Sequence, residues 1–199
     1  MKARDRKVVH SSTEPNWRTP PELFTPLNWE FLFSVDAAAD EANARCKNHF
    51  GPGSRILTDA LSRSWVRVAD ARRWDKPAYF CNPPHSVEHG QPIDPWIEKF
   101  WREGQKATVV AVIPYSVQTK WFRQFVYGHL GDAPGVKGGG WSGYAASEIR
   151  VIPFRVNFLY PDGTPKSGAP GNTCVVIYRP DPGYVGPWVP VTRYWAYAR

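Results

Sequence analysis

The sequence predicts an α/β domain built on a mostly parallel β-sheet. Short apolar segments typical of buried strands alternate with segments of helical periodicity, and two further strand-like segments close the pattern. The nearly continuous apolar run at 107–113 is typical of a strand buried on both faces of a parallel sheet. The chain has 199 residues and 42% hydrophobic residues, which suffices for one folded domain.

The expected elements follow from local patterns in chain order. Thr19 can cap a helix whose first turn contains Glu22, as in a capping box. The segments expected to form further helices are 37–47, 94–104 and 118–127. The segments expected to form strands are 31–35, 55–58, 78–81, 107–113, 148–160 and 172–178.

The remaining segments define the expected domain organisation. Residues 1–15 are basic and lack periodicity, which indicates a flexible arm before a single domain at 16–180. We expect a surface insertion at 66–77 and a long glycine-rich loop at 128–146. Residues 181–199 are rich in proline and aromatic residues and are expected to form a tail.

Charge and cysteine content narrow the class of protein. The net charge of +7 and the pI near 9.4 favour a polyanionic partner. The three cysteines are far apart in sequence and form no C-x-x-C pair, so we expect no metal site and no disulfide framework. No apolar run approaches the roughly 18 residues of a membrane span, and no signal peptide is present. These observations predict a reduced, cytoplasmic protein without membrane partners.

Polar residues follow three of the predicted strands. Asp36 and Asp59 each come at the end of a short apolar segment, and Asn82-Pro83-Pro84-His85 follows the buried strand at 78–81. In open α/β sheets, ligands bind beyond the carboxyl ends of the strands. We therefore expect these residues to converge on one crevice, although Asp36 and Asp59 could equally be ordinary strand-end acids.

Asn82-Pro83-Pro84-His85 suits methyl transfer to an exocyclic amine. The nitrogen lone pair of such an amine is delocalised into the ring, which makes it a poor nucleophile. The Asn82 side-chain oxygen and the Pro83 carbonyl could accept its two hydrogens and stabilise the positive charge that develops on nitrogen. The prolines restrict the backbone, and a flat fourth side chain could stack on a base rotated out of the helix.

The chain resembles the phage-type DNA N6-adenine methyltransferases, a Dam-like family. Seven stretches over residues 16–178 carry the resemblance in the expected order: WRTPPELF, FSVDAAADEANARC, DALSRSW, CNPPHS, PWIEKF, VIPYSVQTKWF and EIRVIPFRVNF. The resemblance implies a seven-stranded, Rossmann-like fold with an antiparallel closing strand. It also implies S-adenosylmethionine as cofactor, double-stranded DNA with a flipped adenine as substrate, and no metal.

The resemblance also implies roles for individual residues. Asn82, Pro83, Pro84 and His85 would form the catalytic turn, and His85 and Phe158 would stack on the target base from its two faces. Asp36 would contact the methionine amino group or lie beside it, and Asp59 would accept from the adenine amine of the cofactor. The residues expected to help hold the methionine end are Thr19, Pro20 and Glu22.

Two positions depart from the family pattern. His85 stands where the family usually has tyrosine or phenylalanine, and histidine is smaller, polar and titrates near pH 6.5. Ala37-Ala38-Ala39 takes the place of a glycine-rich turn after the first strand. Cytosine N4, RNA bases and protein glutamine stay open as alternative targets, because enzymes for these use a similar proline-pair turn. The His85 departure also leaves open an inactive DNA-binding relative.

Basic residues outside the catalytic turn are candidates for contact with DNA phosphates, which position a protein on the duplex. They lie in the arm and in the 66–77 insertion, and the 128–146 loop could assist them. The candidates are Lys2, Arg4, Arg6, Lys7, Arg67, Arg72 and Arg73.

Overall fold

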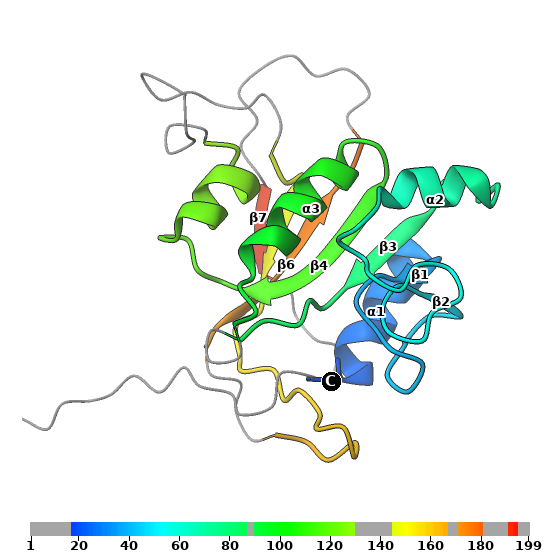
Figure 1. Cartoon of the computed structure of the whole chain (residues 1–199). Helices are drawn as coiled ribbons and strands as arrows, with labels where there is room; N and C mark the ends of the chain where they lie inside the picture. Colours follow the sequence, from blue (N-terminus) through cyan, green and yellow to red (C-terminus); the bar gives the residue numbers. More distant parts are fainter. Residues whose placement is uncertain (1–16, 87–89, 130–144, 167–170, 181–190, 195–199) are drawn as a thin grey trace, which may run out of the picture.

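A computed structural model describes residues 17–86, 90–129, 145–166, 171–180 and 191–194 (Figure 1). They form one mixed sheet with the strand order β2-β1-β3-β4-β6-β5-β7. The strands are β1 (Val35–Asp36), β2 (Asn48–His49), β3 (Ala78–Cys81), β4 (Thr108–Pro114), β5 (Glu148–Val151), β6 (Thr173–Tyr178) and β7 (Val191–Tyr194). The helices are α1 (Pro21–Phe31), α2 (Trp65–Ala71), α3 (Asp94–Gly104) and the π-helix η1 (Phe122–Val126).

The sheet is mostly parallel, which confirms the predicted α/β class. The pairs β1–β2, β1–β3, β3–β4 and β5–β7 are parallel, and β6 is antiparallel to both β4 and β5. The expected antiparallel strand is present as β6, which lies inside the sheet, while β7 extends the sheet beyond β5. β7 comes from the segment at 181–199 that was expected to be a tail.

Alternating side chains of the central strands fill two separate cores. Tyr79 and Cys81 of β3 face a core that includes residues of α2, α3 and η1, which cover the near face of the sheet in Figure 1. Phe80 faces the opposite core, where Leu23 and Leu27 of α1 are fully buried. This alternation is the period of two that a strand buried on both faces requires.

α1 begins and ends at positions that differ from those expected. Pro20 is its N-cap and no side chain caps the helix, so the predicted cap by Thr19 was wrong. The helix runs through Phe31 and ends at Leu32, which adopts a left-handed φ of 51°. The predicted strand at 31–35 is therefore reduced to β1, because its first residues complete the helix. Near the helix end, Glu30 binds Arg150 of β5 through two hydrogen bonds of 2.5 and 2.6 Å.

The segment 37–47 is not the helix that its composition predicted. The Asp36 carboxylate accepts hydrogen bonds from the backbone N–H groups of Arg45 (3.0 Å) and Ala38 (3.5 Å), and these bonds curve the chain into a loop. Asp40 and Asn43 add reciprocal bonds, because each side chain accepts from the backbone N–H of the other. Tertiary hydrogen bonding has thus overridden helix propensity.

The two segments that follow also differ from expectation. β2 replaces the strand predicted at 55–58, where Leu57 forms only an isolated bridge with Phe50. The segment 66–77 is not irregular, because α2 occupies its first half. Ser64 caps α2, and the carboxylate of Glu103 from α3 accepts from the backbone N–H of Val66 at 3.2 Å. The contact with Glu103 comes from another helix and leaves no local sequence signal, although Ser64 is a typical N-cap residue.

The remaining elements match their predictions to different degrees. β3 and α3 have the predicted bounds, and β4 is displaced by one residue from 107–113. The helix expected at 118–127 is present as η1. The strand expected at 148–160 ends at Val151, and residues beyond it form only isolated bridges, which involve Leu159.

Candidate functional site

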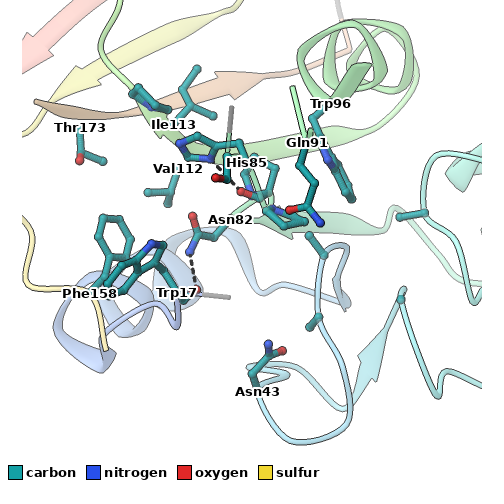
Figure 2. A pocket seen from close by; sticks show the side chains of 18 of the residues that line it. Trp17, Asn43, Asn82, His85, Gln91, Trp96, Val112, Ile113, Phe158 and Thr173 are labelled. Carbon is teal, nitrogen blue, oxygen red and sulfur yellow. Dashed lines mark hydrogen bonds between the residues drawn. The ribbon is translucent and has the colours of Figure 1, made fainter. Parts of the chain in front are cut away.

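A cavity of about 970 Å³ lies at the carboxyl ends of β1, β3 and β4 (Figure 2). Its wall includes the turn after β3, the loops that follow β1 and β2, and the amino end of β6. The residues predicted to converge there do so in part: Asn82, Pro83, Pro84, His85, Asp59 and Phe158 line the cavity, whereas Asp36 does not. The topology therefore concentrates the predicted residues at one edge of the sheet.

The Asn82 side chain is held in one orientation. Its Nδ2 atom donates a 3.3 Å hydrogen bond to the backbone carbonyl of Trp17. The amide oxygen points away from that bond, toward the side of the cavity where His85 lies (Figure 2). Because β3 is fully buried in the centre of the sheet, the position of Asn82 is also fixed along the strand. The arrangement presents a hydrogen-bond acceptor to whatever occupies the cavity.

His85 folds back onto the turn that it ends. Its Nδ1 atom lies 3.1 Å from the Pro83 carbonyl oxygen, which can only accept, so Nδ1 carries the proton. Burial lowers the pKa of His85 below 6.5, although the bond to Pro83 opposes this shift. The ring is therefore neutral at pH 7, with its Nε2 atom as an acceptor. The backbone pair between Ser86 and Gln91, at 2.8 and 2.9 Å, closes the following loop.

Aromatic rings form the wall opposite His85. Figure 2 shows Trp17 and Phe158 on one side of the Asn82 amide and His85 on the other. Two backbone hydrogen bonds of 2.9 Å between Arg18 and Leu159 hold this wall together. The Lys166 ammonium lies 3.8 Å from the centre of the Trp17 ring, a cation–π contact at the edge of the cavity. A flat group could thus lie between the two walls with its edge toward Asn82.

The other end of the cavity is acidic. Asp40 and Asn43 come from the loop after β1, and Asp59 comes from the segment after Leu57. The Asp59 side chain accepts from the backbone N–H of Leu61 at 2.9 Å, which leaves a second carboxylate oxygen for another donor. Two carboxylates at one end of a cavity favour a ligand that carries positive charge or amino groups.

A glycine allows two walls of this acidic end to meet. Gly51 has a φ of 142°, and a Cβ atom at this position would lie only 2.2 Å from the carbonyl oxygen of Ala39. The sequence lacks glycines after the first strand, where Ala37-Ala38-Ala39 stands. In the structure, Gly51 of the facing loop provides the close approach instead. Alanines after the first strand are therefore compatible with this close packing of the cavity wall.

Asp36 lies behind the cavity wall, not in it. Its side chain is 4% exposed and is held by the backbone of Ala38 and Arg45. Burial raises its pKa to about 6, because the hydrogen bonds offset only part of the cost of desolvation. Asp36 therefore organises the loop that carries Asp40 and Asn43.

Three residues expected to hold a cofactor are also absent from the cavity lining. Thr19 and Pro20 are buried and Glu22 is exposed in the first turn of α1. The Thr19 carbonyl instead accepts a hydrogen bond from the Arg45 guanidinium. This bond ties the start of α1 to the loop after β1, so Thr19 contributes to the site through its backbone.

The predicted DNA-binding residues are not gathered at the cavity. Arg67, Arg72 and Arg73 are exposed on and after α2, and residues 72–77 lead to the amino end of β3. The cavity lies at the carboxyl end of the same strand. The four extended residues of β3 therefore separate the amino end of the strand from the cavity by about 13 Å. Lys2, Arg4, Arg6 and Lys7 lie outside the described residues.

The structure adds residues that sequence reasoning missed. Trp17 supplies both a wall and the anchor for Asn82, and Lys166 lies over it. Trp96 of α3 also lines the cavity. Asp40 and Asn43 carried no motif. Their only local signal was the spacing of three residues that permits reciprocal bonds with the backbone.

Neither a metal centre nor a membrane helix is found in the described part of the chain. There, no group of three or more His, Cys, Asp or Glu side chains could hold a metal ion. None of the described helices is long and apolar enough to cross a membrane. Cys81 and Cys174 are buried free thiols, and Cys46 is a partly buried one.

The sequence matches a known protein family over more than half of its length. Residues 7–128, more than half of the chain, match the family described as DNA N-6-adenine-methyltransferase (Dam). The matched range includes β3, the turn that starts at Asn82, and the acidic end of the cavity. A comparison with curated proteins finds no match.

We expect Gly51→Ala to destabilise the protein more than Gly53→Ala. Both glycines have positive φ, but an added Cβ meets the Ala39 backbone at Gly51 and nothing within 4 Å at Gly53. The clash should lower the free energy of unfolding by about 1–3 kcal/mol beyond the cost at Gly53, the usual range for overpacking. Urea denaturation of both variants measures this difference, and equal losses would contradict the close approach.

Asp36 should make the protein less stable as pH rises from about 4 to about 6. Its pKa is about 6 in the folded protein and near 3.8 when unfolded, so the folded state binds more protons in this window. Stability is then lost as the pH rises, by at most about 3 kcal/mol. Urea denaturation of the wild type and Asp36→Asn across this range isolates the effect. A constant difference between the two proteins would contradict it.

Proposed function

The chain belongs to the DNA N-6-adenine-methyltransferase (Dam) family, and we propose that it transfers a methyl group from S-adenosylmethionine to N6 of an adenine rotated out of duplex DNA. The orientation of Asn82 carries this proposal. Its Nδ2 is bound to the Trp17 carbonyl, so its oxygen is the atom offered to the cavity. An amide oxygen fixed in this way can accept a hydrogen from an amine but cannot donate one.

The acidic end of the cavity suits the cofactor. S-adenosylmethionine carries an ammonium group and an adenine amine, and it supplies an electrophilic methyl group when bound. Asp40 would accept from the ammonium and Asp59 from the adenine amine, while Trp96, which also lines the cavity, would offer apolar surface. The volume of about 970 Å³ is near the upper end of small-molecule sites, with room for a nucleoside and an additional base.

The target adenine would lie between the two walls of the cavity. His85 contacts one face of the base, and Phe158 with Trp17 contacts the other, which extends the predicted pair of stacking residues by one ring. Stacking between flat side chains is a common way to hold a flipped base. Histidine can serve here because burial keeps it neutral and the bond to Pro83 fixes its ring.

Asn82 and Pro83 would activate the adenine amine together. The Asn82 oxygen accepts one amine hydrogen and the Pro83 carbonyl accepts the other through the lone pair that His85 leaves free. Both acceptors stabilise positive charge that develops on N6 in the transition state, and the rigid turn avoids the cost of orienting them during the reaction. Pro84 contributes by restricting the backbone. We further propose that the sheet corresponds to the seven-stranded, Rossmann-like methyltransferase fold.

The proposal is tested with labelled S-adenosylmethionine and methylation-free duplex DNA, followed by mass spectrometry of the digested nucleosides. N6-methyladenosine is the expected product. N4-methylcytosine would leave the turn chemistry in place and change the target base. Failure to methylate any nucleoside, with cofactor binding measured separately, would overturn the proposal.

We expect Asn82→Ala and Asn43→Ala to affect different steps. Asn82→Ala should lower kcat by at least about 100-fold with little change in cofactor affinity, because one preorganised acceptor is lost. Asn43→Ala loosens the loop that carries Asp40 and should chiefly weaken cofactor binding. Single-turnover kinetics at saturating cofactor and calorimetric binding separate the two effects. Wild-type turnover in Asn82→Ala would refute its role.

A further inference from the structure

Three short chain segments form a ladder at the edge of the cavity. We call residues 17–19, 158–160 and 164–166 the rim ladder. Arg18 and Leu159 exchange two backbone bonds of 2.9 Å, and Tyr160 and Lys166 donate bonds of 2.8 Å to the carbonyls of Thr164 and Phe158, respectively. The ladder therefore joins the N-terminal segment to the connection between β5 and β6.

The tip of the rim ladder is a structured turn. Gly163 has a φ of 84° and donates to the Tyr160 carbonyl at 2.8 Å. The Asp162 carboxylate accepts from the backbone and the hydroxyl of Thr164, at 2.8 and 2.6 Å. These bonds, together with the nearby charge of Arg18, hold the pKa of Asp162 below its ordinary value. The cation of Arg18 thus lies near the turn.

The position of the rim ladder distinguishes it from the basic segment around α2. In Figure 1 the yellow and orange chain of residues 153–166 extends beyond the carboxyl ends of the central strands, whereas α2 lies at the other end of the sheet. Trp17, Phe158 and Lys166 of the ladder line the cavity itself. The ladder therefore borders the cavity in which the proposed flipped base would lie.

Net charge alone does not distinguish the rim-ladder segments from the basic segment 66–77. Residues 17–19 and 153–166 carry three basic side chains (Arg18, Arg155 and Lys166) against one acidic side chain. Residues 66–77 carry four basic against two acidic side chains, which is the same net charge. Location relative to the cavity therefore decides which segment meets the DNA.

A nucleotide with its base in the cavity leaves its two phosphates at the mouth. Lys166 already places its ammonium there, over the Trp17 ring, and Tyr160 packs on Trp17 with 5.1 Å between ring centres. Arg155 is exposed on the chain that leads into the ladder. Cations beside an aromatic wall are the combination that binds an unpaired nucleotide and its flanking phosphates.

We propose that the rim ladder and the adjoining Arg155 form the surface that binds the DNA backbone beside the flipped adenine, with Arg18, Arg155 and Lys166 as the phosphate contacts. This inference rests on the proposed function. It replaces the expectation that the arginines of the 66–77 segment contact DNA. Phosphate contacts of this kind set the position of the duplex and carry no base specificity by themselves.

The test compares two double variants that remove the same charge. Arg155→Gln/Lys166→Gln alters the proposed surface, and Arg67→Gln/Arg72→Gln alters the exposed segment at the far edge. Affinity for a fluorescent duplex is measured by anisotropy over a salt series, with thermal unfolding to verify folding. We expect the first variant to lose about 10-fold or more in affinity. The slope of log affinity against log salt concentration should become less negative by about 0.9 for each lost phosphate contact.

The second double variant should retain its affinity within about twofold. The single variant Arg18→Gln should weaken binding by itself. Equal losses in the two double variants would show a general charge effect and overturn the proposed surface. Unchanged binding of Arg155→Gln/Lys166→Gln would overturn it as well. If the wild type itself fails to bind duplex DNA, the proposed function falls together with the surface, and this outcome is recognised before any variant is examined.

Discussion

The burial of β3 in the centre of the sheet is the constraint on which the rest of the site depends. Phe80 faces the core against α1, and Tyr79 and Cys81 face the core against α2 and α3. A shift of one residue along the strand would exchange these faces and place each side chain in the wrong core. The strand therefore cannot slip, and Asn82 emerges at one defined point of the sheet edge.

The N-terminal segment before α1 connects parts of the site that lie far apart in sequence. The Trp17 carbonyl holds the Asn82 amide, the backbone of Arg18 pairs with Leu159, and the Thr19 carbonyl accepts from Arg45. Three consecutive residues thus join the turn that starts at Asn82, the connection between β5 and β6, and the loop after β1. In each bond the group that residues 17–19 contribute includes a backbone carbonyl, so the side chains of this segment do not themselves signal its role.

The cavity is electrostatically polarised in a way that suits two ligands of opposite charge. Asp40 and Asp59 line the end that we assign to a cationic cofactor, and Lys166 lies at the mouth, where a polyanion would approach. The neutral His85 and the Asn82 amide occupy the space between these ends. An uncharged centre lets the acceptors act on an amine without a permanent charge that would attract solvent or counterions.

Local sequence determined the elements whose signals are complete within a few residues. The apolar run before Asn82 predicted a buried strand with a rigid turn at its end, because period, burial and proline geometry are properties of the chain itself. Only the tertiary structure decided that Asp36 lies behind the wall, that Trp17 anchors Asn82, and that Arg72 lies at the far edge. These outcomes depend on hydrogen bonds and strand order between distant segments, for which the local sequence carries no signal.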